Sequence, residues 1–297
     1  MVNSVIGQSL FINYRIQTVS AVNDSLLKLE LGHIDSIRIS GFHNDIQFDF
    51  TQFGNLTYCE IFSDTVATIP DDLLKLPLLK RIYFYPSYPI SRLPAELRSN
   101  TNLVEFGMSF ESNDWNRDIL ESLTGIQVLA LNGEFVHSLT KFPRLQSLDL
   151  AISKRDLDDF MSLSRMLPSV KVLTLRSSQE VNINNIQCDS LEYLYLFSKH
   201  RFDPKSPPKF MSGIKALRIA YISDRKYSNL EVLYSCPNLS ILEIGYFKAR
   251  KSVLDCTMVS NLKLIKLGNY DSRIRLHLTC PNLRIESNSY WKDRPGL

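Results

Sequence analysis

Residues 191–196 read LEYLYL, which places leucine at the first, fourth and sixth positions of the stretch. Alternate residues of a β-strand point to opposite faces, so Leu194 and Leu196 share one face while Tyr193 and Tyr195 share the other. The leucine face predicts a buried core, and the tyrosine face predicts an outward surface. The stretch therefore indicates a short strand that is buried on one side.

The same spacing recurs along most of the chain. Units of this form begin at Ile34, Leu56, Leu79, Leu103, Ile126, Leu145, Val170, Leu191, Ile214, Leu239 and Leu262, with a degenerate twelfth at Leu283. Their starts lie 19 to 25 residues apart, and the fourth and sixth positions of the eleven full units are all apolar. A repeat of this kind predicts one strand per unit, paired in parallel with the strands of its neighbours.

The residues on either side of each strand complete the unit. An apolar anchor stands three residues before nearly every start, and Asn, Gly or Ser usually stands immediately before it, which predicts a turn. The returning segments differ from one another. Helical spacing predicts helices at 156–167 and around 230–236, whereas the short unit from Ile126 leaves no room for a helix and 181–186 suggests extended backbone.

Several stretches resemble those of a known family, the leucine-rich-repeat proteins. They include Ile69-Pro70-Asp71-Asp72-Leu73 and Leu93-Pro94-Ala95-Glu96-Leu97, and Cys236-Pro237-Asn238-Leu239 is similar to the cysteine-containing repeats of F-box proteins. The resemblance covers residues 34 to about 288. It implies an α/β solenoid with a curved parallel sheet on its concave side, and mixed short helices and extended segments on its convex side.

The expected organisation is an N-terminal cap over 1–33, a solenoid of about twelve coils over 34–288 and a C-terminal tail over 289–297. A strand at 11–14 is expected to cover the first coil, and no F-box is visible ahead of the repeats. The asparagine ladder usual in such repeats is also missing, because Phe42, Asp64 and Ser87 stand at its expected positions in the first three units. The backbone groups of the turns are therefore expected to find other partners.

Composition and motifs give no support for catalysis. The five cysteines are not closely paired, and three of them (Cys188, Cys236 and Cys280) stand at the apolar anchor position, which favours packing as small hydrophobic residues. The five histidines show no metal-ligand spacing, and no phosphate-binding glycine loop or nucleophile elbow is present. We expect no catalytic residue, no cofactor and no metal ion. The sequence shows no secretory or membrane-spanning segment, so an intracellular location, cytoplasmic or nuclear, is expected.

Aromatic residues at the outward strand positions are the candidate partner-binding residues. In the eighth to tenth units they are Tyr193, Tyr195, Phe197, Tyr221 and Tyr246, flanked by Arg176, Arg218 and Glu243. In the second to fourth units they are Tyr58, Phe62, Tyr83, Tyr85 and Phe110. Large exposed aromatic groups on one face are typical of protein interfaces, although tyrosine also simply suits strands.

Three functions remain open from the sequence. The resemblance implies a scaffold that binds a protein partner of unknown identity through its concave face, and some members of the family are substrate receptors of ubiquitin ligases that act with a separate adaptor. The net charge of +3 gives no strong reason to expect nucleic acid. However, 199–251 holds eleven Lys or Arg against four acids, so nucleic-acid binding through this basic surface is a third possibility.

Overall fold

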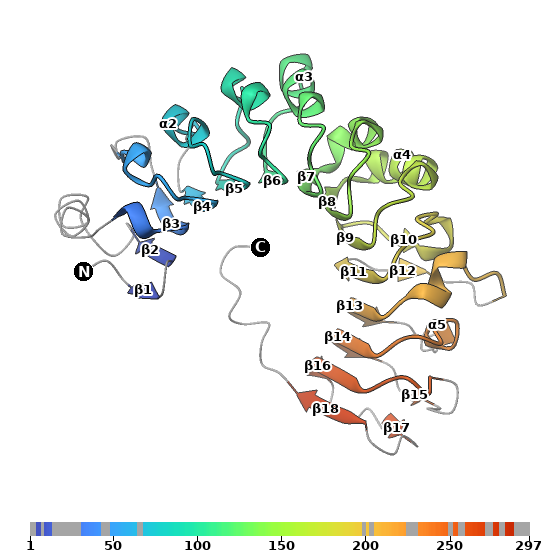
Figure 1. Cartoon of the computed structure of the whole chain (residues 1–297). Helices are drawn as coiled ribbons and strands as arrows, with labels where there is room; N and C mark the ends of the chain where they lie inside the picture. Colours follow the sequence, from blue (N-terminus) through green and yellow to red (C-terminus); the bar gives the residue numbers. More distant parts are fainter. Residues whose placement is uncertain are drawn as a thin grey trace. The chain divides into compact units, whose positions relative to one another are not determined.

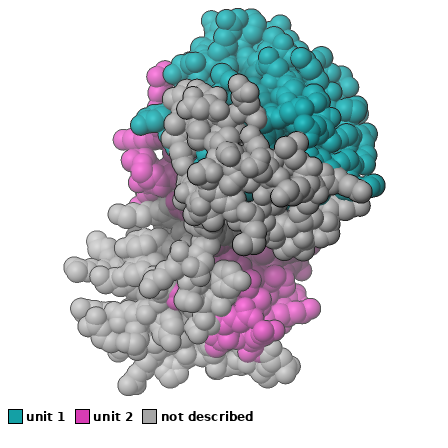
Figure 2. All heavy atoms as spheres, turned by 90° about the vertical axis from the view of Figure 1, so that its left-hand side faces the viewer, with its two compact units in different colours: residues 1–145 teal, residues 146–297 magenta. Residues whose placement is uncertain are grey.

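The computed structural model describes residues 4–6, 9–13, 31–42, 48–63, 68–197, 200–201, 205–223, 231–248, 252–254, 259–270, 276–278 and 283–287. The chain divides into two compact units, residues 1–145 and 146–297, which Figure 2 draws in different colours. Each unit repeats the same plan of one strand per coil.

The described residues of the first unit form seven strands in chain order. They are β1 (Ser4–Ile6), β2 (Ser9–Asn13), β3 (Ser36–Phe42), β4 (Tyr58–Ser63), β5 (Arg81–Pro86), β6 (Glu105–Met108) and β7 (Val128–Asn132). From β2 to β7 each strand pairs in parallel with the next, whereas β1 pairs antiparallel with β2. The expected N-terminal strand is present as β2, whose Leu10 and Ile12 lie beside Ile37 and Ile39 of β3.

The second unit continues the plan. Its main strands are β8 (Ser147–Ile152), β9 (Val172–Ser177), β11 (Tyr193–Phe197), β13 (Ala216–Ser223), β14 (Ile241–Lys248), β16 (Leu264–Tyr270) and β18 (Arg284–Ser287), all paired in parallel. Two small parallel pairs lie apart from them: β10 (Val181–Asn182) with β12 (His200–Arg201), and β15 (Ser252–Leu254) with β17 (Leu276–Leu278). In Figure 1 these pairs lie on the side of the unit opposite the main strands.

Short helical segments return the chain between strands. In the first unit they are η1 (Leu31–His33), η2 (Phe50–Gln52), α2 (Asp71–Leu74), η3 (Ala95–Ser99), α3 (Asp114–Ser122) and η4 (Gly133–Lys141). In the second they are α4 (Lys154–Leu163), η5 (Ser164–Met166), η6 (Ile183–Asn185), η7 (Lys209–Gly213) and α5 (Glu231–Tyr234), where η denotes a 3₁₀ helix. Within each unit the strands of the long sheet line one side, here called the strand side, and these helical segments line the other, the helix side (Figure 1).

The apolar rows of the repeat form the core. The side chains at the fourth positions are at most 1% exposed in all eleven full units, and burying a leucine or isoleucine stabilises a fold by roughly 1.5–3 kcal/mol. Each coil also closes with the predicted turn. In all eleven units the backbone N–H of the first residue donates to the carbonyl of the anchor three residues earlier, with N···O distances of 2.9–3.5 Å.

The returning segments agree with the sequence in part. The predicted helix at 156–167 is present as α4 followed by η5, and α5 lies within the second predicted helix. The short unit from Ile126 has no α-helix, as expected, but forms the 3₁₀ segment η4. Residues 181–186 were expected to be extended, but only β10 is a strand, and the 3₁₀ helix η6 follows it directly. Helix α3 was not anticipated.

Asparagines at the turns form a ladder of their own. Asn55, Asn102, Asn238 and Asn261 each stand immediately before the start of a coil. The Nδ2 group of each donates to a backbone carbonyl of the preceding coil, two residues before that coil starts. The four acceptors are Gly32, Pro77, Ser212 and Pro237, at 2.6–2.9 Å. We call this set of bonds the turn ladder. It gives four backbone carbonyls of the turns a hydrogen-bond donor, a role that the asparagine ladder usual in such repeats would otherwise have.

The last strand shows where the sequence register was wrong. A twelfth unit starting at Leu283 would place Glu286 in the core row, but β18 pairs Ile285 with core residue Ile265 and Glu286 with Lys266. Ile285 is in register with the core row although it is 48% exposed, so the coil is displaced by one residue. With this correction, the repeats, the parallel pairing and the mixed helix side make the fold a leucine-rich-repeat solenoid, as predicted.

Candidate functional site

Half-buried rings cover the strand side of the first unit. Tyr58 and Phe62 extend from β4, and Tyr83 and Tyr85 extend from the neighbouring β5. They occupy outward positions because Cys59, Ile61, Ile82 and Phe84 alternate with them and fill the core. We call these four rings the first aromatic face.

The rings of this face contact one another. Phe62 and Tyr85 stack across the two strands with ring centroids 5.0 Å apart, and Tyr83 stacks with Tyr85 at 6.3 Å. Tyr58 and Tyr83 meet at 6.1 Å in a tilted arrangement. Neighbouring rings at such separations attract each other beyond the area they bury, so the face is a connected surface.

Charged groups lie over these rings or accept from their hydroxyls. Arg38 lies 4.8 Å above Phe62 and pairs with Glu60 at 3.4 Å, while Arg81 lies 5.0 Å above Tyr58. The Tyr58 hydroxyl donates to Glu60 at 3.1 Å. Burial, together with the charge of Glu60, raises the pKa of Tyr58 well above its usual value, so the hydroxyl remains a donor.

Tyr83 is held by the next strand. Its hydroxyl donates to Glu105 of β6 at 3.0 Å, and burial together with this carboxylate raises its pKa strongly. Its ring lies over Gly107, where a Cβ would come within 2.4 Å of Tyr83 Cδ1. Sequence reasoning missed Gly107; a glycine at an outward strand position is the signal that could have found it.

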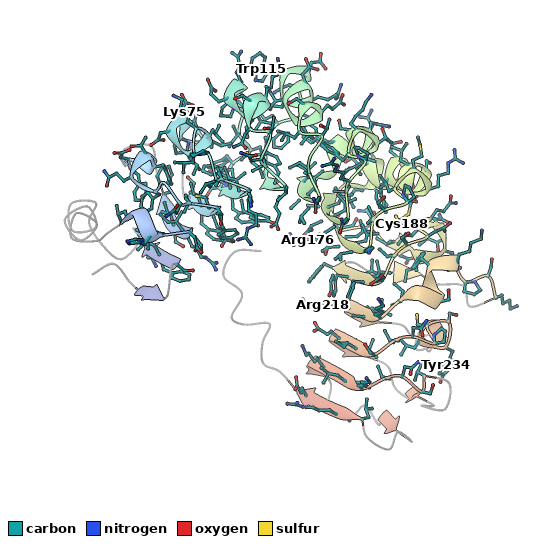
Figure 3. All side chains as sticks on the ribbon, in the orientation of Figure 1. Lys75, Trp115, Arg176, Cys188, Arg218 and Tyr234 are labelled. Atoms are coloured by element: carbon teal, nitrogen blue, oxygen red, sulfur yellow. The ribbon has the colours of Figure 1, made fainter. Side chains whose placement is uncertain are left out.

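A second aromatic face lies on the strand side of the second unit. Tyr193, Tyr195 and Phe197 extend from β11 and are half-buried. The Phe197 ring lies between two guanidinium groups, with Arg176 of β9 at 5.7 Å and Arg218 of β13 at 5.1 Å from its centroid. Figure 3 labels Arg176 and Arg218 on this side of the unit.

The two arginines are in turn held by carboxylates. Arg176 pairs with Asp149 at 2.5 Å, and Arg218 with Glu243 at 3.2 Å, while Lys266 reaches Glu243 at 3.1 Å. Burial raises the pKa of Asp149, an effect that the Arg176 charge opposes. Burial and the Glu243 charge raise the pKa of Tyr195. All three predicted flanking residues, Arg176, Arg218 and Glu243, therefore join the second face.

Of the remaining predicted residues, Phe110 does not join these faces, and Tyr221 and Tyr246 stay predictions. Phe110 is only 2% exposed and packs between Phe106 and Phe135, so the prediction of an outward Phe110 is wrong. It stands at the eighth position of its unit, and alternation returns that position to the core, as Ser63 and Ile152 also show. The backbones of Tyr221 and Tyr246 pair between β13 and β14, but their side chains lie outside the described residues.

The described cysteines are embedded in the fold. Cys59, Cys188 and Cys236 are buried, and burial raises the pKa of the Cys188 and Cys236 thiols to about 12, so these thiols are not nucleophiles near neutral pH. Cys256 and Cys280 lie outside the described residues. Within the described ranges, no group of three or more His, Cys, Asp or Glu could hold a metal ion. In the same ranges, no helix has the length and apolar character needed to cross a membrane.

Comparisons with known proteins give likeness in fold alone. No protein-family model matches the chain, and a search of curated protein sequences found no match. Among solved structures, an internalin from Listeria monocytogenes is similar, with 16% identity over 86% of this chain and 89% of the internalin, at a TM-score of 0.40. The functional domain of InlJ from the same organism is 14% identical over 91% of this chain and 64% of the InlJ chain, at a TM-score of 0.45. The plant peptide hormone receptor RGFR1, in complex with RGF2, is 16% identical over 95% of this chain and 46% of the receptor chain, at a TM-score of 0.40.

Proposed function

We propose that this chain is a protein-recognition scaffold that holds a protein partner against the strand side, with the first aromatic face as the main contact. Leucine-rich-repeat folds are typical of protein-binding scaffolds. The observation that carries the proposal is the set of four rings on β4 and β5, which contact one another and stay half-exposed. Aromatic groups of this kind contribute strongly to protein interfaces.

The order within the first face favours binding. Tyr58 and Tyr83 are fixed by hydrogen bonds to carboxylates, and Phe62 is covered by the Arg38 guanidinium. Rings that are already held lose little conformational freedom when a partner covers them, so more of the contact energy appears as affinity. The second aromatic face has the same character, because Phe197 is held between two arginines.

Replacing two rings of the first face tests the proposal. The double variant Tyr83→Ala, Tyr85→Ala should weaken binding of a co-purifying partner at least roughly 30-fold, the effect of losing an interface residue that contributes about 2 kcal/mol. Quantitative mass spectrometry of affinity-purified chain identifies the partner, and a titration with that purified protein measures the loss.

The matched control is Tyr88→Ala, since Tyr88 is also a tyrosine but is 63% exposed and lies after β5 has ended. It should leave binding unchanged, and circular dichroism should show both variants folded. Equal affinity of the double variant and the parent chain would exclude the first face as the contact.

Two other functions remain predictions. The described contacts favour neither a ubiquitin-ligase substrate receptor nor nucleic-acid binding. For the second, two members of the basic stretch are already paired with acids, Lys215 with Glu192 at 2.7 Å and Arg218 with Glu243 at 3.2 Å. The intracellular location likewise stays a prediction.

A further inference from the structure

The turn ladder of the first unit is interrupted at the third coil, where Leu78 takes the asparagine position, and again at the fifth coil. Asn102, before the start of the fourth coil, donates to the Pro77 carbonyl at 2.9 Å. The same position in the fifth coil is Gly125, which has no side chain to donate. A Cβ at Gly125 would point toward two carbonyl oxygens, lying 3.5 Å from that of Leu103 and 3.9 Å from that of Thr101. The Thr101 carbonyl is the one that an asparagine at 125 would serve.

A recess opens at this break. It has a volume of about 380 Å³, within the lower range of small-molecule sites. It is bordered by the turns that enter the fourth, fifth and sixth coils, and its lining residues are Arg98, Asn100, Thr101, Leu103, Ser122, Leu123, Thr124, Gly125, Pro143 and Arg144. None of its lining residues belongs to the first aromatic face, so the proposed protein contact does not account for the recess.

The lining is positively charged. Arg98 and Arg144 are exposed, and neither forms an ion pair with a described residue. Arg98 is also held in place, because its guanidinium lies 5.4 Å from the Trp115 ring, and the Trp115 Nε1 group donates to the Leu93 carbonyl at 2.8 Å. Figure 3 labels Trp115 on the helix side of the unit. Two arginines with free hydrogen-bond donors favour an oxyanion.

The carbonyl at the break adds a second requirement. An oxyanion without a proton cannot satisfy the Thr101 carbonyl, and would be repelled by it. A ligand that also carries a hydroxyl can donate to this oxygen, as the missing asparagine amide would, while its charge faces the arginines. Thr101 and Thr124 also line the recess, and a threonine hydroxyl can donate to such an oxyanion.

We propose that the recess at the break in the turn ladder binds a small hydroxylated oxyanion, of the class of polyol or sugar phosphates. Arg98 and Arg144 hold the phosphate, and the Thr101 carbonyl accepts from a hydroxyl. Gly125 makes the site possible because it leaves the space empty. The site is independent of the proposed protein contact on the strand side.

Three probes test this chemistry by titration followed with backbone amide NMR. Glycerol 3-phosphate carries both groups, sulfate carries only the oxyanion, and glycerol carries only hydroxyls. Glycerol 3-phosphate should give saturable shifts at Thr101, Thr124 and Gly125, and should bind roughly tenfold more tightly than sulfate, the factor that one hydrogen bond supplies. Glycerol should give none. Absence of saturable shifts with glycerol 3-phosphate would overturn the site, and equal affinity for sulfate would overturn the role of the carbonyl.

Variants separate the site from general effects. Gly125→Asn should abolish the shifts and raise Tm, since its amide would donate to the Thr101 carbonyl in place of the ligand and extend the ladder. Arg144→Gln should weaken glycerol 3-phosphate binding at least about tenfold, whereas Lys141→Gln, an exposed change outside the lining, should not. Tyr83→Ala should bind the probe normally, which distinguishes this proposal from the protein contact. Undiminished binding by a folded Gly125→Asn chain would refute the assignment.

Discussion

Tyr83 depends on a neighbour that has no side chain. Its ring lies over Gly107, and its hydroxyl reaches Glu105, so two residues of β6 fix one residue of β5. The pKa of Tyr83 is raised because this position shields the ring from water and sets the hydroxyl beside a carboxylate. A methyl group at Gly107 would remove all of these effects together.

We expect Gly107→Ala to displace the Tyr83 ring into solvent, since the added carbon would lie only 2.4 Å from Cδ1. The pKa of Tyr83 should then fall toward its ordinary value of 10.0, and its nitration by tetranitromethane at mildly alkaline pH should accelerate. Peptide mass spectrometry gives the rate at each tyrosine. Tyr88 is exposed in both chains and serves as the internal standard; an unchanged ratio of Tyr83 to Tyr88 would contradict this account.

Helix α3 shows how a polar residue can anchor an element. Asn116 is fully buried, and its Oδ1 accepts from the Leu93 N–H at 2.7 Å. Its Nδ2 donates to the Ser91 carbonyl at 3.2 Å and the Glu111 carbonyl at 2.8 Å. One side chain thus ties α3 to the preceding coil and to its own entry loop, and leaves no buried group unsatisfied.

Replacing this residue should therefore cost more than removing a surface contact. Asn116→Leu leaves one backbone donor and two acceptors without their partner, and should lower the free energy of unfolding by at least about 2 kcal/mol. Urea denaturation followed by circular dichroism measures the change. Arg117→Ala, on the next residue, removes only an exposed pair with Asp114 and should change stability by less than about 0.5 kcal/mol. Similar losses in the two variants would show that Asn116 does not anchor the helix.

The same residue explains why α3 was not predicted. Trp115, Ile119, Leu120 and Leu123 have helical spacing, but polar Asn116 lies among them and interrupts the apolar stripe. Its burial depends on carbonyls of another coil, which a local pattern does not contain. Helix α4, by contrast, buries Leu157, Phe160 and Met161, and its apolar spacing was sufficient to predict it.

At the scale of the whole molecule, each described strand pairs with the strands of the coils beside it. Ile82 of β5 is fully buried, and its backbone neighbours are Cys59 of β4 and Phe106 of β6. The consequences of a core defect should therefore stay close to its own coil, as expected of a quasi-one-dimensional fold.

Ile82→Ala should lower the free energy of unfolding by about 2–5 kcal/mol, through lost burial and the cavity left behind. Hydrogen exchange with mass spectrometry should show faster exchange in β4, β5 and β6, and unchanged exchange in β9. Leu173→Ala, which empties an equally buried position of β9, should give the converse pattern. Uniform loss of protection across both units would contradict local shielding.

The sequence predicted most at this scale and least about the site. The apolar rows and turns recur in phase, so the strands, their parallel pairing and the core residues could be read directly, apart from the one-residue displacement at β18. Outward positions carry no such repetition. Alternation places Tyr83 and Tyr195 outward, whereas the same alternation returns Phe110, at the eighth position of its unit, to the core. The contributions of Gly107 and Glu105 depend on pairing between strands, which a local pattern does not contain.

The turn ladder also bears on how the protein ages. An asparagine deamidates when the backbone nitrogen of the next residue attacks its side-chain carbonyl carbon. At Asn55, Asn102, Asn238 and Asn261 the amide donates to a neighbouring coil, and the next residue's N–H donates to the anchor carbonyl. Attack would require both bonds to break, so the folded chain keeps these side chains chemically intact until the coil itself opens.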